Sequence, residues 1–137
     1  MTNVEAMSLT GGCLCGSVRY VASGTPYNVS HCHCSTCRRA SGAAFVSWFS
    51  LRTGELSWAQ GAPKRYRSSQ KAQRTFCPDC GTALTYQRFD RPQEIDITVC
   101  SLDHPERLSP EDHVWTSSRL PWIAPDGLPE HRSDRSD

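Results

Sequence analysis

Seven of the eight cysteines in this chain fall into three closely spaced motifs, and this spacing constrains the fold more than any other feature. The motifs are Cys13-x-Cys15, Cys32-x-Cys34-x-x-Cys37 and Cys77-x-x-Cys80. A structural zinc ion takes four protein ligands, whereas a catalytic zinc ion takes three and keeps one position for water or substrate. Seven thiols therefore predict two zinc ions per chain, one in a complete structural site and one in an active site that lacks a protein ligand.

The two cysteine pairs predict the complete site. Cys77-Pro-Asp-Cys80 followed by Gly81 is typical of a zinc knuckle, because the turn presents two sulfurs to one ion and glycine permits the tight backbone. Cys13 and Cys15 are flanked by glycines, which favour a second turn. One ion held by both pairs would clamp the start of the chain to its middle. The alternative for the second pair is a thioredoxin-like redox dithiol, which requires a βαβ context that the sequence does not show.

The cysteine triplet predicts the open site. The alternative is a second structural site, closed by a fourth ligand from His31, His33 or Cys100. Adjacent side chains on an extended strand diverge, so either histidine would join the triplet only by distorting the backbone. Cys100 lies far off in sequence and is either a distant fourth ligand or an idle thiol.

Thiol activation is the chemistry that a three-thiolate zinc site favours. Three thiolates leave the metal unit with net negative charge, which makes it a poor activator of water, whereas a soft ion binds an incoming thiolate readily and lowers its pKa. We therefore predict catalytic roles for Cys32, Cys34 and Cys37. Arg38 and Arg39 follow the last ligand, and we expect Arg38 to hold substrate charge. Alternatively, both arginines lie on a solvated helix face and have no role in the site.

Charge and compartment exclude several classes of partner. The start of the chain carries no basic cluster or apolar run typical of a secretory signal, and no stretch approaches the roughly 20 apolar residues of a membrane span. We therefore expect a cytoplasmic protein, in which clustered cysteines bind metal rather than form disulfides. The formal net charge of +1 falls to about −2 if seven thiolates hold two zinc ions. This balance gives no reason to expect a nucleic acid or an anionic membrane as partner.

Short, partly alternating apolar runs bounded by Gly, Pro and Ser predict a mostly β fold. The candidate strands are Ser17–Ala22, Tyr27–Cys32, Ala43–Ser50, Leu56–Gln60, Lys64–Arg67, Gln73–Phe76, Ala83–Gln87, Glu94–Cys100 and His113–Thr116. Ala43–Ser50 is apolar on both faces and is expected to be a central, buried strand. One short helical turn is expected with Ser35 as its N-cap and Gly42 past its end, so that its first amides point toward sulfur.

Three further segments have less specific patterns. The basic run Lys64–Arg67, followed by Lys71 and Arg74, is expected to be a solvated edge strand rather than a nucleic-acid strip. The aromatic segment 113–122 is expected to form either core and rim contacts or a lid over the zinc pocket. Residues 125–137 are polar, so we expect a globular domain over 8–124 and a frayed C-terminal tail.

The cysteine motifs carry a resemblance to a known family. Gly-Gly-Cys13-Leu-Cys15-Gly, His-Cys32-His-Cys34-Ser-Thr-Cys37-Arg-Arg and Phe-Cys77-Pro-Asp-Cys80-Gly resemble the glutathione-dependent formaldehyde-activating enzyme family, which includes the centromere protein V relatives. The resemblance runs from about Ser8 to Trp122. It implies a β-tent of small antiparallel sheets stapled by zinc, with a structural ion on the two pairs and an active-site ion on the triplet.

The resemblance also implies an activity and its partners. The family's named reaction joins formaldehyde to the thiol of glutathione and is classed as a carbon–sulfur lyase reaction. A zinc-dependent lyase acting on adducts of a small thiol, such as glutathione, with a small aldehyde is therefore expected. Two other functions stay open. One is a non-catalytic zinc module that binds protein or nucleic acid, and the other is a thiol sensor in which the triplet is oxidised.

Overall fold

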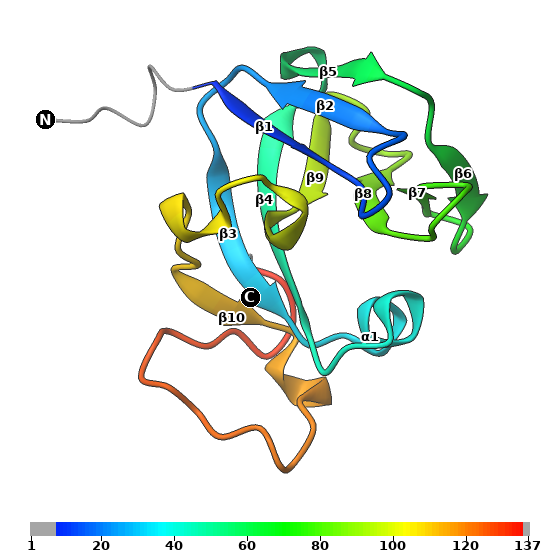
Figure 1. Ribbon diagram of the computed structural model, residues 1–137. Helices are drawn as coiled ribbons and strands as arrows, with labels where there is room; N and C mark the ends of the chain where they lie inside the picture. The colour runs from blue at the N-terminus through cyan, green and yellow to red at the C-terminus, as the bar shows by residue number, and fades with distance from the viewer. Residues whose placement is uncertain (1–7, 136–137) are drawn as a thin grey trace, which may run out of the picture.

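The computed structural model describes residues 8–135 and shows a mostly β chain with one short α-helix (Figure 1). The strands are β1 (Leu9–Gly12), β2 (Arg19–Ala22), β3 (Tyr27–Cys32), β4 (Val46–Arg52), β5 (Leu56–Gln60), β6 (Lys64–Arg67), β7 (Ala72–Phe76), β8 (Ala83–Arg88), β9 (Glu94–Thr98) and β10 (Asp112–Val114). Helix α1 (Ser35–Ser41) lies between β3 and β4. Short 3₁₀ turns are formed by Thr53–Glu55, Val99–Ser101, Pro105–Arg107 and Thr116–Ser118.

The strands form two sheets. The smaller sheet has the order β1-β2-β5, and the larger has the order β10-β3-β4-β9-β8-β7-β6. All neighbouring strands run antiparallel except β10, which pairs parallel to β3 with His113 opposite His31. The predicted mostly β fold of antiparallel sheets with one short helix is therefore confirmed, and the parallel pair is its one departure among residues 8–135.

The main core lies between the two sheets. Tyr20 and Val18 face it from the side of the smaller sheet, and Phe49, Leu84 and Ile97 face it from the larger sheet. Each of these side chains is at most 1% exposed. Burial of such large apolar side chains contributes roughly 1.5–3 kcal/mol each, so this layer holds the sheets together.

Strand β4 separates this core from the site. Phe49 and Leu51 point into the core, while Val46 and Trp48 pack on the opposite face against Cys32, in a second buried cluster. The two-faced apolar pattern predicted a central strand, and β4 lies inside the larger sheet between β3 and β9. Its boundaries, Val46–Arg52, fall later than the predicted Ala43–Ser50.

Several predicted boundaries differ from the structure for local reasons. Strand β1 was absent from the prediction because its glycines break the apolar pattern, yet it pairs with β2 along its length. The predicted strand Glu94–Cys100 ends at Thr98, and the chain then turns through Val99–Ser101. The helix N-cap is Cys34 rather than Ser35, since the Cys34 sulfur accepts a hydrogen bond from the Cys37 amide.

The polar segment after Pro125 is not a frayed tail within the described residues. The amide of His113 donates to the carbonyl of Pro129 at 2.9 Å, and the amide of His131 donates back to the His113 carbonyl at 2.9 Å. Arg135 makes two hydrogen bonds to the buried carboxylate of Asp112, at 2.6 and 2.7 Å. The predicted boundary at 124 therefore separates no independent tail, because the segment docks on β10 through backbone bonds and an ion pair.

The basic run forms an exposed edge, as predicted. Strand β6 is the last strand of the larger sheet, and all four of its residues are exposed. Such charges on an edge oppose pairing with another chain. In residues 8–135 we find no helix with the length and apolar character needed to cross a bilayer.

Candidate metal centres and active site

The two cysteine pairs meet, as predicted, at one end of the molecule. The Cys13 and Cys15 sulfurs are 3.6 Å apart, and the Cys15 and Cys77 sulfurs are 3.8 Å apart. All four sulfurs, including that of Cys80, lie within 4.8 Å of one another and form no disulfide. Tetrahedral zinc with bonds of about 2.3 Å to sulfur places its ligands roughly 3.8 Å apart. The donor set and its spacing therefore fit a zinc ion.

Backbone amides and a tight turn position the sulfurs of Cys77 and Cys80 for metal binding. The amides of Asp79 and Cys80 donate to the Cys77 sulfur at 3.3 and 3.4 Å, as expected of a knuckle turn. Gly81 follows with φ of +84°, a conformation that favours glycine. Hydrogen bonds from Thr82 lower the pKa of the Cys80 thiol to about 5. A thiolate is the form that binds metal, so this turn favours ligation.

The cysteine triplet gathers where β3 runs into α1. Cys32 ends the strand, Cys34 caps the helix, and Cys37 lies in its first turn. The Cys32 and Cys37 sulfurs are 3.5 Å apart, and all three sulfurs lie within 4.8 Å of one another. Hydrogen bonds with the thiols of Cys32 and Cys37 lower the pKa of Cys34, and the hydroxyl of Thr36 acts in the same direction. These soft donors also fit zinc.

No fourth protein ligand joins the triplet among residues 8–135. His31 and His33 turn away, since His31 Nδ1 contacts Ser47 Oγ at 2.8 Å and His33 Nε2 contacts His113 Nδ1 at 2.8 Å. Cys100 is exposed on a 3₁₀ turn and belongs to neither cysteine cluster. Of the two alternatives that the sequence left open, the described geometry supports the three-ligand site.

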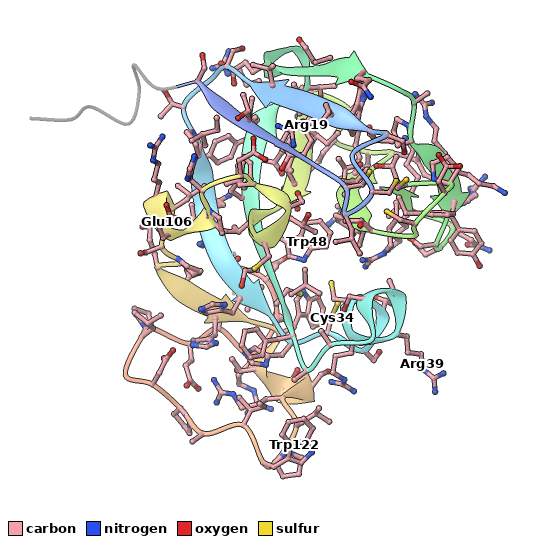
Figure 2. All side chains as sticks on the ribbon, viewed as in Figure 1. Arg19, Cys34, Arg39, Trp48, Glu106 and Trp122 are labelled. Atoms are coloured by element: carbon pink, nitrogen blue, oxygen red, sulfur yellow. The ribbon has the colours of Figure 1, made fainter. Side chains whose placement is uncertain are left out.

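The guanidinium beside the triplet comes from Arg74, not Arg38. Arg38 does not line the cavity; it donates to the backbone carbonyls of His33 and Ser118, and so it fastens the helix to the loop that carries Ser118. The side chain of Arg39 extends away from the site (Figure 2). Arg74 instead lies 3.5 Å from the Cys37 sulfur and stacks over the Tyr86 ring at 4.9 Å. The basic composition of the run predicted a solvated Arg74, although strand alternation places it on the same face as the buried Ala72.

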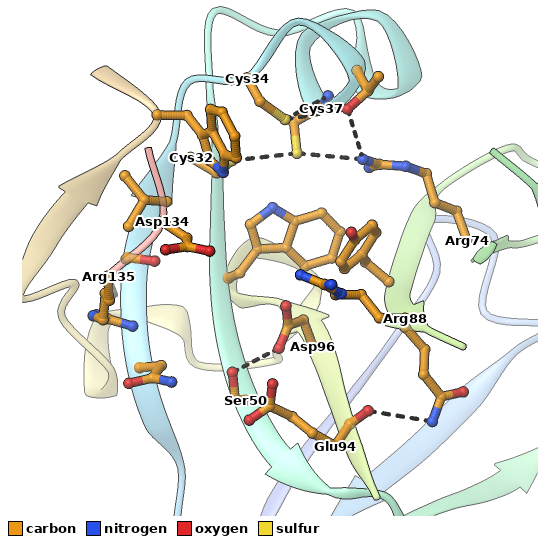
Figure 3. Close-up of a pocket in the computed structure, with 18 of the residues that line it drawn as sticks. Cys32, Cys34, Cys37, Ser50, Arg74, Arg88, Glu94, Asp96, Asp134 and Arg135 are labelled. Atoms are coloured by element: carbon orange, nitrogen blue, oxygen red, sulfur yellow. Dashed lines mark hydrogen bonds between the residues drawn. The ribbon is translucent and has the colours of Figure 1, made fainter. Parts of the chain in front are cut away.

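The triplet forms one end of a cavity of about 660 Å³, a size typical of small-molecule sites. Figure 3 shows the sulfurs at one end, Asp96 and Glu94 at the other, and an indole between them. Trp48, Arg74 and Tyr86 also line the cavity, with Arg74 beside the sulfurs. The C-terminal segment also contributes to the wall, through Asp134 and Arg135. The cavity is therefore lined by acidic, basic and aromatic side chains.

The predicted aromatic lid is present only in part. Val114 and Trp115 line the cavity, whereas Trp122 lies outside it and is 71% exposed. Trp115 has a positive φ of 57°, which is rare for a bulky residue and costs of order 1–3 kcal/mol. Its amide donates to the Ser133 carbonyl at 2.8 Å. The C-terminal segment thus holds Trp115 in this strained position at the cavity wall.

Asp96 is a half-buried acid of the cavity. Burial raises the pKa of this carboxyl from 3.8 to about 6, while a hydrogen bond of 2.6 Å from the Ser50 hydroxyl acts in the opposite direction. A raised pKa means that the folded state favours the protonated, neutral form of the carboxyl group. Its contribution to stability is therefore present below about pH 4 and is lost as the pH rises through 6.

Replacing Asp96 with asparagine is expected to stabilise the protein at neutral pH by about 3 kcal/mol, because the pKa rises from 3.8 to about 6 and one pKa unit corresponds to roughly 1.4 kcal/mol. Urea unfolding at pH 4.5 and pH 7.5 measures this, and the gain should be clearly larger at the higher pH. Asp90 is the control, since the nearby Arg88 lowers its pKa and Asp90→Asn should give no such gain. An equal effect of Asp96→Asn at both pH values would contradict the assignment.

Comparison with known proteins agrees with this geometry. The family model described as glutathione-dependent formaldehyde-activating enzyme matches residues 8–118, which include all seven clustered cysteines. The chain belongs to this family. The resemblance inferred from the cysteine motifs is therefore confirmed.

Individual relatives of this chain carry related names. An uncharacterized lyase of Schizosaccharomyces pombe is 34% identical over 76 residues, which cover 56% of this chain and 55% of that protein. The matched segment thus spans about half the length of the yeast relative. A Halomonas elongata protein that bears the name of the glutathione-dependent formaldehyde-activating enzyme family is 26% identical over 126 residues, 85% of this chain and 80% of its own.

A solved structure shares the fold. The crystal structure of a Rhodobacter sphaeroides protein superposes with a TM-score of 0.55 and 24% identity, covering 89% of this chain and 98% of its own. Identity at this level supports a shared fold and no more.

Proposed function

We propose that this protein is a zinc-dependent carbon–sulfur lyase that handles adducts of glutathione, or a similar small thiol, with formaldehyde or a similar small aldehyde. The observation that carries the proposal is the triplet of Cys32, Cys34 and Cys37 at the wall of a cavity, with no fourth protein ligand in residues 8–135. The family membership and the names of the relatives support the same reaction class.

The reaction forms one bond between sulfur and carbon. The substrate thiol loses its proton, its sulfur attacks the carbonyl carbon of the aldehyde, and the carbonyl oxygen gains a proton to give an S-hydroxyalkyl product. The reverse direction cleaves the same bond. Zinc on the three cysteines supplies a soft site that favours the thiolate form of the substrate at neutral pH. The structural ion on the four paired cysteines has no part in the chemistry and holds the sheets in place.

Arg74 is the side chain that offsets negative charge at the reacting sulfur. Arg74 is buried, and its guanidinium lies 3.5 Å from the Cys37 sulfur. Arg74 lines the cavity, so its guanidinium can meet an anionic group of the substrate there, while its buried Nε has no hydrogen-bond partner among residues 8–135. Stacking on Tyr86 and Trp48 fixes the plane of the guanidinium.

The rest of the cavity fits a ligand that carries both signs of charge. Arg88 and Arg91 can meet carboxylates, while Glu94 and Asp96 can meet an ammonium group at the end away from the sulfurs (Figure 3). Glutathione carries a thiol, two carboxylates and an ammonium group, and this set matches the wall. Trp48 and Tyr86 add an aromatic surface to the cavity wall, against which the small aldehyde can lie.

The direct test is acceleration of adduct exchange. Nuclear magnetic resonance exchange measurements on mixed glutathione and formaldehyde should show faster interconversion of the free thiol and its adduct when zinc-loaded protein is added. Buffer with the same concentration of free zinc is the control. Equal rates with protein and with free zinc would overturn the proposed function.

The Arg74→Met variant is expected to lower kcat/KM for the thiol by about 10- to 100-fold, because hydrogen bonds to charged groups contribute roughly 1.5–3 kcal/mol. Methionine keeps the apolar stem over Tyr86, so zinc content and melting temperature should change little. Arg65→Met on the exposed strand β6 is the matched control. An unchanged kcat/KM in Arg74→Met would show that Arg74 has no part in the reaction.

A further inference from the structure

A third group of metal-type ligands lies at the outer edge of the larger sheet and shares no residue with the two cysteine clusters. One ring nitrogen from each of His31 and His113 and one carboxylate oxygen of Asp126 lie within 4.8 Å of one another. The histidines are opposite each other in the parallel pair of β3 and β10, so their rings share one face of the sheet. The ring centroids are 4.9 Å apart.

Hydrogen bonds to neighbouring side chains orient the two histidine rings of this group. His113 directs Nε2 toward Asp126 Oδ1 at 2.9 Å and Nδ1 toward His33 Nε2 at 2.8 Å. The His31 ring is held by its hydrogen bond to Ser47. Metal-bound histidines usually use one ring nitrogen for the ion and the other for a hydrogen bond that orients the ring. Both rings are therefore fixed before any ion arrives.

The carboxylate is also pre-positioned and gives access from solvent. Asp126 Oδ1 accepts the amide of Leu128 at 3.1 Å, which fixes the carboxylate over His113. The side chain of Asp126 is 48% exposed, whereas that of His113 is 4% exposed. Ligand atoms of a tetrahedral zinc ion with bonds near 2.0–2.1 Å are roughly 3.3 Å apart, so a small outward shift of Asp126 admits an ion.

We propose that His31, His113 and Asp126 form a third metal site, free of sulfur, that binds Zn²⁺ or another borderline divalent ion and leaves room for water. Two imidazoles and one carboxylate are a donor set typical of zinc. Asp126 comes from the segment that leads into the strand-like pairing of Pro129 and His131 with β10. An ion here fastens that segment to the sheet, and with it the wall of the cavity that carries Asp134 and Arg135. The site does not depend on the reaction proposed above.

The test is a titration of the zinc-loaded full chain with Co²⁺. Cobalt at a cysteine site gives strong sulfur-to-metal charge-transfer absorption, whereas cobalt on imidazole and carboxylate gives only the weaker ligand-field bands. We expect one further equivalent to bind with ligand-field bands alone. Asp126→Asn and His31→Gln should each weaken this binding by more than about tenfold.

The matched controls are His104→Gln and Glu106→Gln, which alter an exposed histidine–carboxylate contact of 3.5 Å elsewhere on the surface. These variants should leave the extra equivalent unchanged. Circular dichroism checks that each variant is folded. Absence of a sulfur-free equivalent in the parent protein, or its persistence in both Asp126→Asn and His31→Gln, would overturn the third site. Neither result would alter the exchange assay that tests the proposed lyase.

Discussion

Replacing Cys80 with serine is expected to abolish soluble folded protein. The four paired cysteines join the turn after β1 to the knuckle between β7 and β8, and Cys77 is completely buried in the main core. Structural zinc contributes apparent free energies of roughly 10–16 kcal/mol in small zinc domains, as large as the total stability of about 5–15 kcal/mol of a typical domain. Loss of one thiolate therefore removes much of a binding free energy that is comparable with the whole stability of the domain.

Expression yield in the soluble fraction and the far-ultraviolet circular dichroism spectrum measure this effect. Cys100→Ser is the matched control, because Cys100 is exposed and lies outside both cysteine clusters. That variant should match the parent in yield and melting temperature. A Cys80→Ser protein that is soluble, melts cooperatively and keeps the parent melting temperature would show that the knuckle does not hold a structural ion.

Replacing Cys34 with serine is expected to leave the protein folded but to abolish its activity. Serine is among the best N-cap residues, so its hydroxyl can accept the Cys37 amide hydrogen bond that the Cys34 sulfur accepts now. Helix α1 should therefore form, and the main core lies on the other face of β4. With two thiolates left, the triplet should lose its zinc ion.

The expected readouts are a fall from about two cysteine-bound zinc ions per chain to about one and a loss of exchange activity of more than about 100-fold, since even partners outside the ligand shell are worth about 10–100-fold. Plasma emission spectrometry counts the zinc, and the His31→Gln background removes any contribution from the third site. Global unfolding of Cys34→Ser would favour a purely structural role for the triplet. Full activity with one zinc ion per chain would exclude the triplet from catalysis.

Local chemistry made much of this molecule predictable from its sequence. Cysteine spacing is a local property, and it located the knuckle, the helix after the first ligands and the three-sulfur group. The αL residue Gly42, with φ of +67°, ends the helix where the sequence placed it. The apolar residues on both faces of β4 likewise predicted its burial. Successive side chains of a strand point to opposite faces of the sheet, so apolar residues at successive positions indicate that both faces are covered.

Long-range polar contacts explain what the sequence did not reveal. Arg74 enters the site through pairing of β7 with β8 and stacking on Tyr86, and a basic run offers no local sign of either contact. The C-terminal segment docks through backbone hydrogen bonds and the ion pair of Arg135 with Asp112, neither of which leaves an apolar pattern. Arg38 follows a ligand in sequence, but the helix turns it toward the carbonyls of His33 and Ser118.

Access of a substrate thiol to the ion on the triplet is the central claim, and one spectrum tests it directly. Protein with Co²⁺ on Cys32, Cys34 and Cys37 is titrated with glutathione, and S-methylglutathione, whose sulfur is blocked, serves as the control. Sulfur-to-cobalt charge-transfer absorption should increase in a saturable, one-to-one manner with glutathione and stay constant with the methylated compound. An unchanged spectrum at saturating glutathione, with cobalt shown to occupy the triplet, would contradict the claim.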